Sequence, residues 1–105
     1  MIGKEELGLM KRTAFLINVA RAQIVNRRAL CTALYSGAIA GAAFDVFWEE
    51  PADPDDKLLQ LDNFVLTPHI AGWTIESANV AATIITTNIK KIAQGEAPLT
   101  AVNSF

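Results

Sequence analysis

Three polar side chains of this sequence could together carry out acid–base chemistry on a carboxylic acid: Arg21, Glu50 and His69, the last being the chain's single histidine. An arginine fork binds a carboxylate through two parallel, charge-assisted hydrogen bonds. A histidine, with an ordinary pKa of ~6.5, gives or takes a proton near neutral pH. A glutamate bonded to its other ring nitrogen fixes the tautomer and favours the charged form. The set suits a substrate with a carboxylate beside a carbonyl or hydroxyl group.

Each of these residues also has an ordinary structural explanation. An arginine after a strand is usually a surface charge, and a single histidine is more often structural than catalytic. Acids in a loop as acidic as residues 49–56 (EEPADPDD) are usually solvated. Loops at strand ends are nevertheless where functional residues concentrate. The case for a site therefore depends on whether the fold brings the three side chains together.

The elements expected around these residues are helices alternating with strands. Continuous apolar runs predict strands at residues 14–19, 39–47 and 64–67. Helices are predicted at residues 3–10, at 26–36 with Asn26 as N-cap, and from 74 or 76 to 93, with an extended tail at 97–105. Strands joined by helical crossovers form parallel sheets. We therefore expect an α/β fold: part of a doubly wound parallel sheet with about three strands, plus a long C-terminal helix.

This topology predicts where the polar residues meet. Arg21 follows the first strand, Asp45 ends the second, Glu50 lies in the next loop, and His69 comes directly after the third. In open α/β sheets, ligands bind outside the carboxyl ends of the strands, which lie along one edge. We therefore expect the four side chains to converge there.

The predicted strands are rich in Ala, Val, Ile and Leu, which is typical of a sheet covered on both faces. Gly41 suggests that a helix approaches the second strand closely, and Leu30 and Leu34 mark the buried face of the helix at 26–36. A chain this short buries only ~60–70% of its unfolded surface. The composition therefore indicates part of a bigger fold.

Composition excludes several classes of protein. With 51% hydrophobic and 19% charged residues, the 105-residue chain is too apolar to be disordered. Its net charge of −2 argues against nucleic acid as a partner. One cysteine, Cys31, makes no internal disulfide and no thiolate metal site, so no metal is expected. No apolar run approaches the ~20 residues of a membrane span, and no secretory signal opens the chain. We expect a cytoplasmic protein.

Three segments resemble motifs of one family, the D-isomer-specific 2-hydroxyacid dehydrogenases. Residues 16–26 (LINVARAQIVN) resemble the family's L-I-N-x-x-R-G-x-x-V-D. Residues 41–51 (GAAFDVFWEEP) resemble G-A-x-x-D-V-F-x-x-E-P, and residues 63–72 (NFVLTPHIAG) resemble N-V-x-x-T-P-H-x-x-G. The segments occur in the family's order, and the resemblance spans nearly the whole chain.

The resemblance implies an oxidoreductase that uses NAD or NADP, with NAD favoured, to interconvert small 2-oxo acids and D-2-hydroxy acids. It implies that Arg21 holds the substrate carboxylate, that His69 is the acid/base and that Glu50 is its partner. Asp45 would contact the nicotinamide carboxamide. The implied cofactor-binding residues are Ala20, Arg21, Asp45, His69 and Gly72.

The resemblance also implies an incomplete site. The family's G-x-G-x-x-G phosphate-binding turn lies upstream of all three segments, so the match covers only the C-terminal part of such an enzyme. Residues 1–72 would form the second half of a Rossmann-type dinucleotide-binding domain, and residues 73–105 the crossover helix and tail. We expect little or no activity from the chain by itself.

Two alternatives remain open. The chain could be a non-catalytic half-domain that self-associates as a homodimer through the open edge of the strand at 14–19. A hydrolase that uses Cys31 and His69 ranks far behind both other hypotheses.

Overall fold

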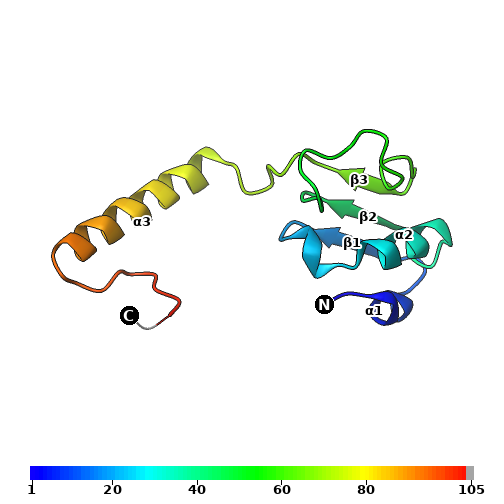
Figure 1. Cartoon of the computed structure of the whole chain (residues 1–105), viewed down its shortest axis with the longest axis horizontal. Coiled ribbons are helices and arrows are strands. Elements are labelled where there is room, and N and C mark those ends of the chain that lie inside the picture. The colour runs from blue at the N-terminus through cyan, green and yellow to red at the C-terminus, as the bar shows by residue number, and fades with distance from the viewer. Residues whose placement is uncertain (104–105) are drawn as a thin grey trace. The chain divides into compact units, whose positions relative to one another are not determined.

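The computed structural model describes residues 1–103 and confirms the predicted order of elements (Figure 1). Residues 104 and 105 of the predicted tail lie outside the described part. The elements are α1 (Lys4–Gly8), β1 (Phe15–Asn18), the short 3₁₀ helix η1 (Ala22–Ile24), α2 (Arg27–Tyr35), β2 (Gly41–Phe44), β3 (Phe64–Leu66) and α3 (Ile75–Ala93). Only η1 has no counterpart among the predicted elements.

The three strands form one parallel sheet in the order β1-β2-β3, which confirms the predicted α/β architecture. The register pairs Leu16 with Ala42 and Ala42 with Phe64. The second strand is shorter than predicted and ends at Phe44. The prediction extended it because Val46 and Phe47 are apolar, but these two residues are buried without belonging to the strand. All three strands end at one edge of the sheet, as the site requires.

One face of the sheet carries the core. Helix α2 begins at the N-cap Asn26, whose side chain accepts a hydrogen bond from the Ala29 amide, and it buries Leu30 and Leu34 as predicted. The buried residues form a single cluster that includes Leu7 of α1. Because the core is this small, we expect each large apolar side chain in it to contribute strongly to stability.

No element of the unit Met1–Ala71 covers the opposite face of the sheet. Phe15 and Ile17 of β1 are each 69% exposed, and Val65 of β3 is 58% exposed. Within residues 1–71 only one face of the sheet is covered, which agrees with the expectation that the chain is part of a bigger fold. Sequence composition indicates that a face is apolar, but it does not say which element buries that face.

At Gly41 itself, the space is limited by the neighbouring strands rather than by a helix. A Cβ atom at Gly41 would lie 2.8 Å from the carbonyl oxygen of Asn63 and 3.1 Å from the ring of Phe15. The glycine starts the central strand, so the segments that begin the two neighbouring strands crowd it.

The chain divides into two compact units, Met1–Ala71 and the residues from Gly72 onward. Helix α3 belongs to the second unit and begins with a capping box between Thr74 and Ser77. The tail is not extended as predicted, because the side chain of Asn88 binds both the Leu99 amide (2.8 Å) and the Thr100 hydroxyl (2.9 Å). Among the described residues, no helix has the length and apolar character needed to span a bilayer.

Candidate functional site

The turn that carries Arg21 is built by a side chain at the end of β1. Asn18 is buried, and its Oδ1 accepts a hydrogen bond from the Ala20 amide at 3.0 Å. Its Nδ2 donates to the Arg21 carbonyl oxygen at 2.9 Å. The exposed Arg21 side chain also donates to the Ala20 carbonyl oxygen at 2.7 Å. The strand end thus fixes the backbone of the arginine while leaving its guanidinium accessible.

The carboxylate of Asp45, directly after β2, organises the loop that follows β3. It accepts hydrogen bonds from the Thr67 hydroxyl, the Ile70 amide (3.0 Å) and the Ala71 amide (2.8 Å). The Thr67 hydroxyl and then the two amides hold the pKa of Asp45 below its ordinary value, against the opposing effect of burial. Asp45 is therefore ionised at neutral pH, and it links the ends of β2 and β3.

His69 lies in this loop and adopts a left-handed backbone conformation, with φ of 58°. Such a conformation is uncommon for any residue other than glycine and persists only where its surroundings enforce it. Here the flanking residue Ile70 is bound by Asp45, and the His69 amide donates to the Thr67 carbonyl oxygen at 2.9 Å. These hydrogen bonds fix the backbone of His69 at the carboxyl end of β3.

Glu50 binds the imidazole of His69. Its Oε2 lies 2.9 Å from Nδ1 of His69, and its Oε1 accepts the Phe47 amide at 2.8 Å. The hydrogen bond from His69 and then that from Phe47 hold the pKa of Glu50 below its ordinary value, with a further contribution from the charge of Arg21. Because an ionised Glu50 can only accept a hydrogen bond, Nδ1 of His69 is the donor, and Nε2 is the ring nitrogen that Glu50 does not contact.

Arg21, Glu50 and His69 line one cavity of about 230 Å³, together with Phe47 and Trp48. The side chains of His69 and Glu50 are 46% and 42% exposed, so a small molecule can reach them. Glu50 and His69 also line a neighbouring cavity of about 310 Å³. A guanidinium, a carboxylate and an imidazole thus line one accessible cavity.

The other predicted site residues, Ala20, Asp45 and Gly72, do not line this cavity. Ala20 is in the turn held by Asn18, next to Arg21. Gly72 opens the second unit and is described only there, where its carbonyl oxygen accepts a hydrogen bond from Ser77 at 2.7 Å. Cys31 lines two other cavities, neither of which His69 lines, so the geometry offers nothing for the hydrolase hypothesis.

Sequence reasoning missed two residues that support the site, Asn18 and Thr67. Each had a detectable signal, because each is a polar residue at the end of an apolar strand segment. Such residues hydrogen-bond nearby backbone groups or the ends of neighbouring strands.

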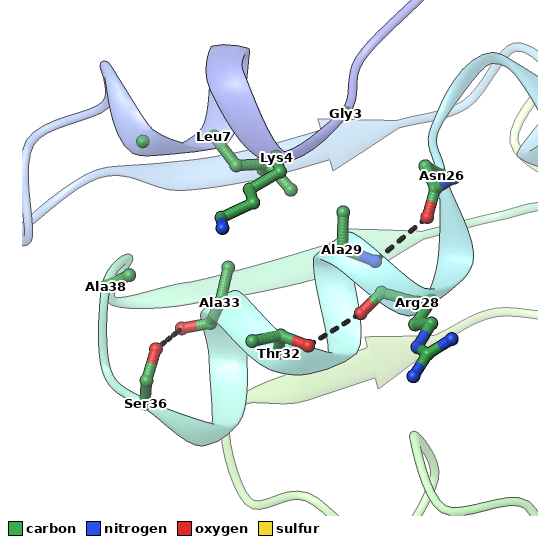
Figure 2. A pocket seen from close by; sticks show the side chains of 11 residues that line it. Gly3, Lys4, Leu7, Asn26, Arg28, Ala29, Thr32, Ala33, Ser36 and Ala38 are labelled. Carbon is green, nitrogen blue, oxygen red and sulfur yellow. Dashed lines mark hydrogen bonds between the residues drawn. The ribbon is translucent and has the colours of Figure 1, made fainter.

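A larger cavity, of about 530 Å³, lies elsewhere, between α1 and α2 (Figure 2). Its uncharged polar side chains already have partners: Asn26 caps Ala29, Thr32 donates to a carbonyl oxygen of its own helix, and so does Ser36. It contains no histidine or carboxylate, so it does not compete with the strand-end cavity as a candidate site.

Comparison with known proteins identifies the family. Residues 1–71 match the model of the D-isomer specific 2-hydroxyacid dehydrogenase, NAD binding domain. A glyoxylate reductase of Korarchaeum cryptofilum is 47% identical over 103 residues, which are 98% of this chain and 31% of that protein.

Solved structures agree. A D-isomer specific 2-hydroxyacid dehydrogenase of Xanthobacter autotrophicus Py2, in complex with NADPH and MES, superimposes with a TM-score of 0.85 at 41% identity, over 97% of this chain and 41% of that one. An NADPH-dependent glyoxylate/hydroxypyruvate reductase of Sinorhizobium meliloti, with NADP and malonate, gives a TM-score of 0.84 at 38% identity, over 96% of this chain and 31% of that one. The chain therefore belongs to the D-isomer-specific 2-hydroxyacid dehydrogenases and spans less than half the length of the relatives it matches.

Proposed function

We propose that this chain supplies the acid–base and carboxylate-binding half of an active site that reduces 2-oxo acids to D-2-hydroxy acids with NAD(P)H. The observation that carries the proposal is the shared cavity of Arg21, Glu50 and His69 at the carboxyl ends of parallel strands. Residues 1–72 would act as the second half of the dinucleotide-binding domain, and residues 73–105 as the crossover helix and tail. The malonate bound by the Sinorhizobium relative supports a carboxylate substrate.

Each residue of the cavity has a chemical role in this proposal. The guanidinium of Arg21 binds the substrate carboxylate and polarises the adjacent carbonyl. Nε2 of protonated His69 donates a proton to the carbonyl oxygen as the oxygen becomes a hydroxyl. Glu50 holds Nδ1 of His69 at 2.9 Å, which fixes the orientation and the tautomer of the ring. In the reverse direction, Nε2 of neutral His69 accepts the hydroxyl proton.

The residues present fit the nicotinamide end of the cofactor. The Asp45 carboxylate offers about four acceptor positions, of which three are used by Thr67, Ile70 and Ala71. The remaining position suits the amide donor of a carboxamide. No G-x-G-x-x-G pattern occurs in the sequence, so these residues offer no such pyrophosphate turn. When bound, the nicotinamide supplies or accepts the hydride; NAD is our first choice because the matched model is an NAD-binding domain.

A chimaera tests the proposal. The C-terminal segment of the Korarchaeum glyoxylate reductase is replaced by this chain along the 103 aligned residues. We expect reduction of glyoxylate, followed at the absorbance of NADH and separately of NADPH. His69→Gln should lower kcat by about 10²–10⁴-fold, and Arg21→Gln should raise KM. Arg28→Gln, at an exposed arginine of α2, is the matched control.

A folded chimaera whose glyoxylate reduction is unchanged by the substitution His69→Gln would refute the proposed role of the histidine. For the unmodified chain, we expect no binding of NADH at micromolar concentration. Titration of nicotinamide fluorescence tests this, and a micromolar dissociation constant would show that the phosphate-binding turn is dispensable.

We propose self-association as a second candidate function, because β1 is an edge strand whose bare face is apolar. Its backbone pairs with β2 on one side only, and Phe15 and Ile17 are largely exposed. Two copies could pair through β1 across a two-fold axis and form a six-stranded sheet. Sedimentation should show a homodimer that Ile17→Lys dissociates; a monomer at high concentration would eliminate this candidate.

A further inference from the structure

Arg27 occupies an electrostatically unfavourable position. It is the first residue of α2, where the helix dipole disfavours a positive charge. Tertiary contacts must therefore account for its ordered place in the structure. The partners of Arg27 lie in the sequence on either side of Glu50.

The guanidinium of Arg27 contacts both ends of the segment at residues 47–56, which we name the Glu50 loop. At its start, the Arg27 guanidinium carbon lies 5.6 Å from the ring centroid of Phe47 and 5.8 Å from that of Trp48. At its end, Arg27 forms an ion pair with Asp56, whose side chain is only 8% exposed. A planar guanidinium suits this double contact, because it stacks on rings and binds a carboxylate at once.

Both ends of the Glu50 loop are also fixed to the rest of the unit. Oδ1 of Asp56 accepts the amide of the core residue Leu58 at 2.9 Å. The indole nitrogen of Trp48 donates to the Val25 carbonyl oxygen at 3.2 Å. Val25 lies at the end of the segment that begins with Arg21. The loop that presents Glu50 is therefore tied to the segment that presents the arginine.

We propose that Arg27 is a positioning residue: by holding both ends of the Glu50 loop, it keeps Glu50 within hydrogen-bonding distance of His69. Its relevance to catalysis rests on the proposed function, but the positioning itself does not. Glu50 is part-exposed, and Phe47 donates its amide to it from the same loop. Without the contacts of Arg27, the Glu50 loop can move away from the end of β3, and the hydrogen bond between Glu50 and His69 weakens.

The test uses the full chain and measures the pKa of the Glu50 carboxyl by ¹³C NMR. This pKa reports on the hydrogen bond between Glu50 and His69, because that bond is the largest cause of the lowered Glu50 pKa. In Arg27→Gln and in Asp56→Asn, we expect the Glu50 pKa to rise toward its ordinary value. Arg27→Lys keeps the charge without the planar fork and should restore the pKa only in part. Arg28→Gln, the neighbouring arginine, should leave it unchanged.

The free energy of unfolding is measured in parallel on the same variants. A raised Glu50 pKa in a folded variant supports the proposal. An unchanged pKa in folded Arg27→Gln or Asp56→Asn, with or without lower stability, overturns it and leaves a structural ion pair only. Should Arg27→Gln not fold, Asp56→Asn and Arg27→Lys decide. No cofactor or turnover is involved, so an inactive chimaera would refute the proposed function without affecting this result.

Discussion

The two units of the chain obtain their structure in different ways. The unit Met1–Ala71 contains every residue of the buried core, from Leu7 to Phe64. Helix α3 of the second unit has no buried residue, although Ile85, Ile89 and Ile92 lie exposed along it. Taken unit by unit, packing holds the strand-end site in place, whereas α3 depends on local signals within its own unit.

Those local signals are complete at both ends of α3. Thr74 and Ser77 form the capping box, Glu76 lies in the first turn, and Lys90 and Lys91 lie in the last. Each placement suits the helix dipole. An isolated helix of this length is still only marginally stable in water. We therefore expect α3 to exchange its amide hydrogens much faster than the sheet does.

The largest expected effect is a loss of stability in the first unit that leaves α3 unchanged. Phe44, in the central strand, is 2% exposed and stacks on Trp48 with ring centroids 5.5 Å apart. Phe44→Ala should cost about 3–5 kcal/mol of stability in residues 1–71, measured by urea unfolding with tryptophan fluorescence. NMR signals of α3 should not change; loss of α3 in the same transition would show that the units are cooperative.

A smaller effect is expected at the turn of Arg21. Asn18→Ala leaves the Ala20 amide and the Arg21 carbonyl without their side-chain partner. The cost should be about 1–3 kcal/mol, with increased mobility confined to the turn. The same unfolding experiment measures the cost, and a variant as stable as the parent would mean that water replaces the side chain without loss.

Acid should destabilise the first unit through its carboxylates. The pKa of Asp45 and that of Glu50 are lower in the folded chain than their ordinary values. Their contribution is therefore present above the unfolded pKa values, about 3.9 and 4.3, and is lost as the pH falls through the lowered values. Asp45→Asn should be less stable than the parent at pH 7, and the difference should shrink below about pH 4.

The smallest effect on the stability of the first unit is expected from a substitution in α3. Ile85→Ala removes a side chain that is 57% exposed. The stability of residues 1–71 should change by less than about 0.5 kcal/mol. A larger loss would reveal that α3 packs against the first unit and would break the contrast between the two.

Much of the site could be predicted because it follows from topology. Parallel strands place Arg21, Asp45 and His69 at one edge, whatever the details of packing. The sequence pattern could not reveal the partners of Asp45, or the hold of Arg27 on the Glu50 loop. Those contacts join residues at least twenty positions apart, and only the folded chain brings them together. What covers the second face of the sheet could not be predicted for a related reason, since apolar composition does not say which element covers it.

The central claim is that the strand ends hold His69 against Glu50, and the tautomer of His69 tests it most directly. With one histidine in the chain, two-bond ¹H–¹⁵N NMR spectra of the unmodified protein at about pH 8 report a single imidazole. The account predicts that the neutral ring carries its proton on Nδ1, donated to Glu50, and that Glu50→Ala abolishes this preference. A ring that carries its proton mainly on Nε2 in the unmodified chain would contradict the account.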